Sequence, residues 1–110
     1  MALTEIWLRF RMEGKGVKFE EHCEESERLF GSRFEKVHLW LDELFYAGEG
    51  ARHRRIRHNE AGIKQVIQLF GREAGEAARQ HILSDLKEYG WTEADRFPQD
   101  EEDYLKIIGL

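Results

Sequence analysis

The spacing of apolar residues from Glu20 onward constrains the fold of this chain more than any other feature. They recur every three or four positions, the pattern that places them on one face of an α-helix. Glycines interrupt the pattern at four places, and glycine commonly follows the last residue of a helix. The segments between them predict helices at about residues 20–30, 32–46, 52–70 and 73–89. Because short connections favour antiparallel neighbours, the predicted fold is all-α, a compact antiparallel bundle of about four helices.

The second and third of these helices supply the predicted core. Ser32 is the expected N-cap of the second helix, and Glu35, three residues later, completes a capping box. The apolar face of the third helix is predicted to pack against that of the second, with Ile56, Ile63, Ile67 and Phe70 against Val37, Leu41 and Leu44.

The first residues follow a different pattern. Residues 5–12 alternate apolar and polar side chains with the two-residue period of a half-buried strand. Residues 13–16 suit a turn, and Val17 and Phe19 resume the alternation, so a short β-hairpin is predicted, with a helix capped by Thr4 as the alternative. We therefore divide the chain into residues 1–19, an N-terminal extension or hairpin, and residues 20–110, a single helical domain. Its acidic tail is expected to form a loop and a short closing turn or helix.

Composition argues against several classes of protein. No stretch approaches the roughly 18 consecutive apolar residues of a membrane-spanning helix. The single Cys23 cannot form an internal disulfide, which is typical of a reducing compartment and predicts a cytoplasmic protein. A net charge of −5 argues against a general nucleic-acid binder, since binding to phosphates needs a basic surface. The abundance of Glu and Arg, with one Asn and four Gln, is typical of a thermophilic source.

Histidine and aspartate recur at one spacing in two of the predicted helices. His38 and Asp42, and likewise His81 and Asp85, are four positions apart, so each pair lies on one helical face, within roughly 40°. Both pairs border the apolar stripe and should point toward the interior. Imidazole and carboxylate side by side suit a divalent metal ion such as zinc or manganese. Alternatively, each Asp orients its His by a hydrogen bond, or each pair only stabilises its own helix.

The other three histidines extend this candidate site unequally. His22 lies on the first predicted helix, and His53 lies beside the apolar stripe of the third. His58 is five positions after His53, about 140° around a straight helix, so the two cannot face the same centre. We therefore expect His58 at the surface or in an interface. The predicted metal ligands are His22, His38, Asp42, His53, His81 and Asp85.

Arg52, Arg54, Arg55 and Arg57 form a basic block that contains no acidic residue. Such a block could bind a phosphate group or an acidic partner. The alternative is that these arginines neutralise acidic residues of the chain itself, in the first helix or the tail. Because the remaining surface is acidic and would repel a polyanion, the alternative is favoured.

Four motifs follow one another along the chain: His22-Cys23-x-x-Ser26…Phe30-Gly31, His38-x-Trp40-x-Asp42, Arg52-His53-Arg54-x-x-Arg57-His58-Asn59-x-x-Gly62-Ile63, and Gln80-His81-x-x-x-Asp85. Over about residues 20–91 they resemble a family of short bacterial and phage proteins that is classed only as a domain of unknown function. The resemblance implies a small soluble fold and no particular activity, cofactor or partner. The chain departs from the family's pattern between Gly71 and Gln80, where residues 72–79 are predicted to be helical.

Two functions are compatible with these features. The first is a small helical protein that hydrolyses a phosphoester at a His/Asp site. A divalent metal held there or a histidine would assist the reaction, and the basic block would bind phosphate. The second is a non-catalytic binding or assembly module, in which the His/Asp pairs are structural and the block meets an acidic partner or a second copy in a homo-oligomer. Geometry separates them, because a functional site requires the rings to converge on one centre.

Overall fold

The computed structural model describes residues 16–45, 47–48 and 53–108 of the chain. Every regular element in these ranges is a helix: α2 (Gly16–Phe30), α3 (Glu35–Asp42), the 3-10 helix η1 (Glu43–Phe45), α4 (Arg54–Arg57), α5 (Glu60–Phe70), α6 (Arg72–Lys87) and α7 (Glu101–Ile108). The all-α prediction is confirmed, although the described residues form six α-helices rather than four. None of these helices is long and apolar enough to cross a membrane.

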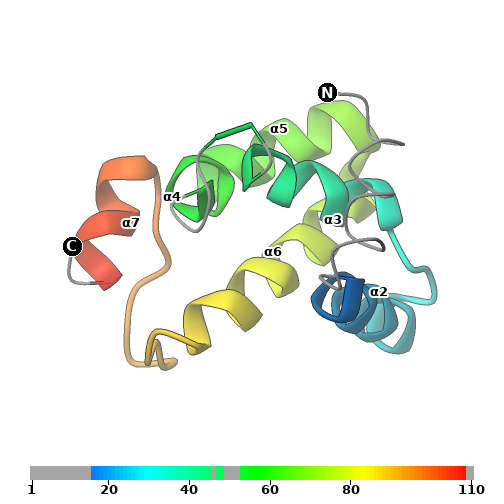
Figure 1. Cartoon of the computed structure of the whole chain (residues 1–110), viewed down its shortest axis with the longest axis horizontal. Helices are drawn as coiled ribbons and strands as arrows, with labels where there is room; N and C mark the ends of the chain where they lie inside the picture. The colour runs from blue at the N-terminus through cyan, green and yellow to red at the C-terminus, as the bar shows by residue number, and fades with distance from the viewer. Residues whose placement is uncertain (1–15, 46, 49–52, 109–110) are drawn as a thin grey trace.

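Helix α6 is the element around which the others are arranged (Figure 1). It contacts α2, α3 and α5. In Figure 1, α3 and α5 lie above α6, and α7 lies beside α4 at the far end. Helix α2 is seen nearly end-on while α6 runs across the view, so the two cross steeply instead of lying antiparallel. This steep crossing brings a face of α2 against the middle of α6.

Two glycines allow α6 to turn back closely beneath α5. Gly71 alone joins the two helices, and its φ of 101° is one that residues other than glycine rarely adopt. Gly75 faces α5, and a Cβ atom at this position would lie 2.8 Å from Cγ1 of Ile67. The two helices therefore pack with their backbones close together, and α6 presents its other faces to α2 and α3.

The core is built where α3, α5, α6 and α7 meet. Its buried members are Val37, Trp40, Leu41, Ile63, Val66, Ala74, Ala78, Ile82, Leu86 and Tyr104. Ile63 thus joins Val37 and Leu41 as predicted, and Phe70 packs against this cluster. The prediction was wrong for Ile67, which is 38% exposed, because the face of α5 that carries it turns partly toward solvent.

Three local predictions differ from the structure. Val17 and Phe19 are helical rather than part of a strand, because α2 begins at Gly16; residues 1–15, where the rest of the predicted hairpin falls, lie outside the described residues. Phe34, rather than Ser32, is the N-cap of α3, and its left-handed φ of 50° turns the chain into the helix without a side-chain cap. The predicted helix over residues 52–70 is divided into α4 and α5.

The break between α4 and α5 lies at His58 and Asn59. His58 has φ −89° and ψ 63°, outside the helical region, and Asn59 is fully extended. The Asn59 side chain accepts a hydrogen bond from the backbone N–H of Gly62 at 2.9 Å and so caps α5. Gly62 is required here, since a Cβ atom would lie 1.8 Å from the carbonyl oxygen of Arg57. The chain therefore changes direction at His58. Residues 72–79, by contrast, are helical as predicted.

Candidate metal centre

All five histidines and two aspartates meet in the interior. Helix α2 contributes His22; α3 contributes His38 and Asp42; His53 and His58 flank α4; and α6 contributes His81 and Asp85. We call these seven residues the His/Asp cluster. Each is buried, with at most 8% of its surface exposed. The fold thus brings ionisable residues that are far apart in the sequence, from His22 to Asp85, into one small volume.

Asp85 lies among three imidazole rings from three different segments. His22 Nε2 is 3.3 Å from Asp85 Oδ1, His81 Nε2 is 3.2 Å from Asp85 Oδ2, and His58 Nδ1 is 3.5 Å from Asp85 Oδ2. The predicted pairing of His81 with Asp85 on one face of a helix is therefore confirmed. The crossing of α2 over α6 and the break at His58 add the other two rings.

Asp42 is the second acidic centre of the cluster. Its Oδ1 accepts a hydrogen bond from His53 Nε2 at 2.9 Å, and it lies 3.4 Å from both His58 Nε2 and His81 Nε2. The two carboxylates are therefore linked through His58 and His81, which each contact both of them.

The expectation that His58 lies at the surface or in an interface was wrong. Its ring is fully buried between Asp42 and Asp85. That expectation holds only for one straight helix through His53 and His58, whereas the chain leaves helical geometry at His58. The sequence signal for this break is Asn59, an N-cap residue followed directly by Glu60, which is typical of a new helix start.

His38 does not pair with Asp42 in the way its spacing suggested. Its Nε2 is hydrogen-bonded to Ser26 Oγ at 2.8 Å, and its Nδ1 is hydrogen-bonded to His81 Nδ1 at 2.9 Å. His22 stacks on His81 with ring centroids 3.7 Å apart. His38 is thus part of the cluster through His81, and Ser26 is a member of the network that sequence spacing did not indicate.

Burial and the two carboxylates separate a charged His81 from a neutral His58 and a neutral His38. Burial opposes charge on His81, but Asp42 and Asp85 outweigh it and raise the pKa of His81 to about 9. Burial lowers the pKa of His58 to about 4, and burial with the nearby charge of His81 lowers that of His38 to about 2. Burial alone would raise the pKa values of Asp42 and Asp85, but the histidines, His81 foremost, hold both below their usual range.

Several buried atoms of the cluster make no hydrogen bond within the described part of the chain. They are His22 Nε2, His58 Nδ1, His81 Nε2 and both oxygens of Asp85. Buried polar atoms nearly always have partners, because an unmade bond in the interior costs roughly 1–3 kcal/mol. All of these atoms belong to or contact Asp85, so they indicate one centre at which a binding partner is expected.

The donor set fits a divalent metal ion. Asp42, His58, His81 and Asp85 can each offer one ligand atom with all four atoms within 4.8 Å of one another, and His22, His38 and His81 form a second such group. Ligands about 2.0–2.1 Å from a tetrahedral zinc ion are roughly 3.3 Å apart. The separations of 3.2 Å between His81 and Asp85 and 3.4 Å between His81 and Asp42 match this value. The buried His/Asp cluster could therefore hold a metal ion.

Two basic side chains cover Asp85 at the edge of the cluster. Lys18 Nζ and Arg54 Nη2 lie 3.3 and 3.5 Å from Asp85 Oδ1, and both also pair with Glu88. Their side chains are 35% and 17% exposed. They separate Asp85 from solvent on this side.

The rest of the basic block is paired with acids of the chain itself. Arg55 Nε is 3.0 Å from Glu101 Oε1 in α7, and Arg57 donates to Glu43 at 2.8 Å and to the Trp40 carbonyl at 2.7 Å. Arg52, the fourth member, lies outside the described residues. This arrangement supports the interpretation that the block neutralises acidic residues of the chain, including one in the tail.

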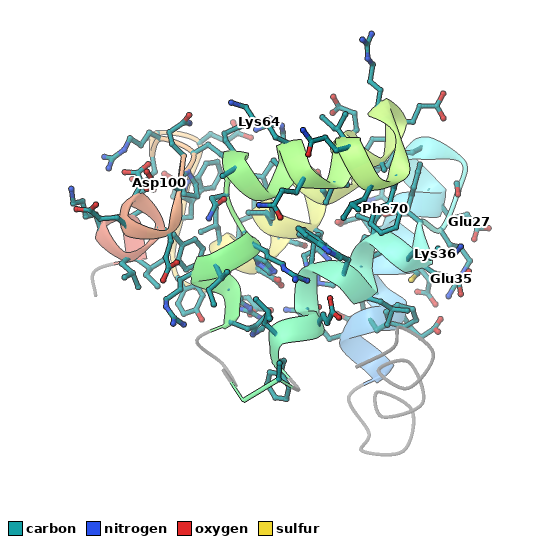
Figure 2. The ribbon with its side chains drawn as sticks, turned by 90° about the horizontal axis from the view of Figure 1, so that it is seen from above. Glu27, Glu35, Lys36, Lys64, Phe70 and Asp100 are labelled. Carbon is teal, nitrogen blue, oxygen red and sulfur yellow. The ribbon has the colours of Figure 1, made fainter. Side chains whose placement is uncertain are left out.

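Two cavities of the described structure lie away from the cluster. The larger, of about 550 Å³, is lined by residues 32–37 and Phe70, and Figure 2 shows Glu35, Lys36 and Phe70 together at that end. Another, of about 290 Å³, lies beside α7 and includes Arg96 and Lys106. Neither of these two cavities is lined by a residue of the His/Asp cluster.

Comparison with known proteins adds a family to this geometry. A family model described as Domain of unknown function (DUF6915) matches residues 17–94. No curated protein and no solved structure matched the chain. The matched range contains the whole His/Asp cluster, from His22 to Asp85.

Proposed function

The chain belongs to the family described as Domain of unknown function (DUF6915), and we propose that it is a metal-binding domain whose His/Asp cluster holds one divalent ion, zinc or manganese. The proposed ligands are Asp42, His58, His81 and Asp85, with His22 as a further donor beside Asp85. His53 orients Asp42 through a hydrogen bond to its carboxylate, and metal ligands commonly have such hydrogen-bond partners.

The contact between His58 and Asp85 carries this proposal. His58 Nε2 donates its proton to the Leu41 carbonyl oxygen at 3.2 Å. With a pKa of about 4, the ring is neutral at pH 7, so Nδ1 has a lone pair and no proton. That lone pair lies 3.5 Å from the carboxylate oxygen Oδ2 of Asp85, and neither atom makes a hydrogen bond to the residues that the structure describes. Two buried acceptors that face one another are costly, and a cation between them would satisfy both.

The charge of the cluster supports a divalent ion in particular. Asp42 and Asp85 together carry two negative charges in the interior, where isolated charges are costly. Without a metal, His81 supplies one positive charge. In the described contacts, Lys18 and Arg54 reach Asp85 from its outer side but do not reach Asp42. A divalent ion would balance both carboxylates from within.

The burial of every proposed ligand favours a structural role over a catalytic one. Structural zinc sites are closed by protein ligands, whereas catalytic sites keep a coordination position open. The described arginines of the basic block, which the hydrolase hypothesis assigns to phosphate, are paired with Glu88, Glu101 and Glu43. We therefore propose that the metal joins α2, α3, the α4–α5 junction and α6 and has a structural role rather than a role in phosphoester hydrolysis.

Metal content and thermal unfolding test this proposal together. Protein produced without a histidine tag should contain about one equivalent of metal by elemental analysis. A chelator should lower the melting temperature, and zinc or manganese should restore it, because a ligand that binds only the folded state stabilises it. Asp85→Asn should abolish metal retention, whereas Glu76→Gln on the exposed face of the same helix should not. An unchanged melting temperature with chelator and with added metal would instead favour a purely structural hydrogen-bond network.

A further inference from the structure

We propose that His38 and Ser26 act as positioning residues for the metal ligand His81, through a hydrogen-bond chain that runs in one direction from His81 Nδ1–H to His38 Nδ1 and from His38 Nε2–H to Ser26 Oγ. This inference rests on the proposed metal centre and assigns His38 a role different from the ligand role that its spacing suggested. It also makes Ser26, a residue of α2 that contacts no carboxylate of the cluster in the described contacts, a determinant of metal binding.

The direction of the chain follows from the position of His81. Its Nε2 lies 3.2 Å from Asp85 and 3.4 Å from Asp42 and makes no hydrogen bond to the described residues, so this atom faces the proposed metal position. A nitrogen that binds a metal uses its lone pair, and a neutral imidazole then carries its one proton on the other nitrogen. His81 Nδ1 is therefore the donor.

The proton positions on His38 are then determined in turn. Its Nδ1 is 2.9 Å from His81 Nδ1, and only one proton fits between these two atoms, so His38 Nδ1 accepts. The proton of the neutral His38 ring must lie on Nε2, which is 2.8 Å from Ser26 Oγ and donates to it. Both nitrogens of His38 are thus used in hydrogen bonds, which leaves no lone pair for a metal.

The surroundings of the chain make each link hard to replace. His38 and Ser26 are each only 1% exposed, so water cannot readily take the place of either partner. The ring of His22 stacks on His81 at 3.7 Å and restricts its rotation from the other side. The orientation of the His81 ring is therefore set by its neighbours on α2 and α3 before a metal arrives.

Long-range ¹H–¹⁵N correlation spectra of the zinc-loaded wild-type protein test the chain directly. We expect the His38 ring to be protonated on Nε2 and the His81 ring on Nδ1, with His81 Nε2 showing the shift of a zinc-bound nitrogen. A proton on His38 Nδ1, or a zinc-bound shift for either nitrogen of His38, would overturn the inference. No variant is needed, so a loss of folding cannot obscure the result.

Substitutions in the hydrogen-bond chain should weaken zinc binding as much as the loss of a hydrogen-bond partner of a metal ligand usually does. Ser26→Ala and His38→Leu should each raise the zinc dissociation constant roughly 10–100-fold. His38→Asn should recover part of the loss relative to His38→Leu, because its amide oxygen can accept from His81 in place of Nδ1. Ser32→Ala, at an exposed serine, is the matched control and should bind zinc like the wild type. Wild-type affinity in Ser26→Ala or His38→Leu would contradict the positioning role.

The outcomes separate this inference from the proposed function. Zinc binding at one equivalent together with the reversed proton pattern on His38 overturns the positioning chain and leaves the metal centre standing. If the protein binds neither zinc nor manganese, both the proposed metal centre and the positioning role of His38 and Ser26 are overturned.

Discussion

At the scale of single residues, one backbone conformation decides whether the His/Asp cluster closes. His58 reaches both Asp42 and Asp85 only because the chain leaves helical geometry there. Asn59 stabilises the break by capping α5, and Gly62 lets the first turn of α5 approach the carbonyl oxygen of Arg57. The central imidazole of the cluster is therefore placed by two neighbours that would bind no metal themselves.

Gly62→Ala should therefore disrupt both the fold and the site. The added methyl group would meet backbone rather than a flexible side chain, so the α4–α5 junction must move. We expect a loss of about 1–3 kcal/mol or more in the free energy of unfolding, measured by denaturant titration, and a loss of bound metal. Gln65→Ala, at an exposed position of the same helix, should change neither quantity by much. Full metal retention in Gly62→Ala would show that the position of His58 does not depend on this close approach.

Part of the candidate site could be predicted from residue spacing alone. Four-residue spacing on a helix correctly placed His81 beside Asp85 and turned Asp42 inward, because helical geometry is regular over one turn. Helical spacing placed His58 wrongly, because the regular geometry ends wherever a cap such as Asn59 starts a new helix. The contact of His38 with Ser26 and His81 joins three different helices, and spacing within one segment carries no information about it.

At the scale of the helices, apolar patterning predicted which segments are helical more accurately than it predicted where each helix ends. The predicted segments at 20–30 and 73–89 correspond to α2 and α6, and the closing helix expected in the tail corresponds to α7. Helix ends depend on single contacts that periodicity does not contain, as at Phe34, where a left-handed residue replaces the expected cap at Ser32. The steep crossing of α2 and α6 depends on packing between distant segments, so antiparallel neighbours were the wrong expectation for this pair.

Leu41→Ala tests the packing of α3. The side chain is fully buried in the core, so its truncation should cost roughly 2–5 kcal/mol of unfolding free energy in a denaturant titration. Leu69→Ala, at a residue 58% exposed on α5, is the matched control and should cost less than about 1 kcal/mol. Similar losses in the two variants would mean that α3 does not contribute its apolar face to the core.

At the scale of the whole molecule, the buried charges make stability depend on pH from both sides. The pKa of His81 is raised to about 9, so its contribution is complete below about pH 6.5, the unfolded value, and is lost as the pH rises through about 9. The pKa values of His58, at about 4, and of Asp42 and Asp85 are lowered. Their contributions are present above the unfolded values and are lost as the pH falls, below about 6.5 for His58 and below about 4 for the carboxylates.

The melting temperature of metal-free protein should therefore be highest near pH 6.5 and fall toward both pH 4 and pH 9. Zinc should remove the alkaline decline, because the ion takes the place of the His81 proton. It should leave the acid decline or steepen it, because protons compete for the ligands. Thermal scans from pH 4 to pH 9.5 with and without zinc measure this difference. Glu76→Gln should reproduce the wild-type profiles, and coincident profiles with and without zinc would contradict the expectation.

The burial of the cluster also determines how long a bound ion would stay in place. Since every proposed ligand is buried and Lys18 and Arg54 cover Asp85, an ion at this centre could leave only when helices separate. Its residence time would then follow the rate at which the fold opens, and exchange with isotopically labelled zinc should slow in parallel with amide hydrogen exchange in α6. A chain of this design would acquire its ion while folding. The metal that it carries would therefore reflect which ions were available at its synthesis more than those it encounters later.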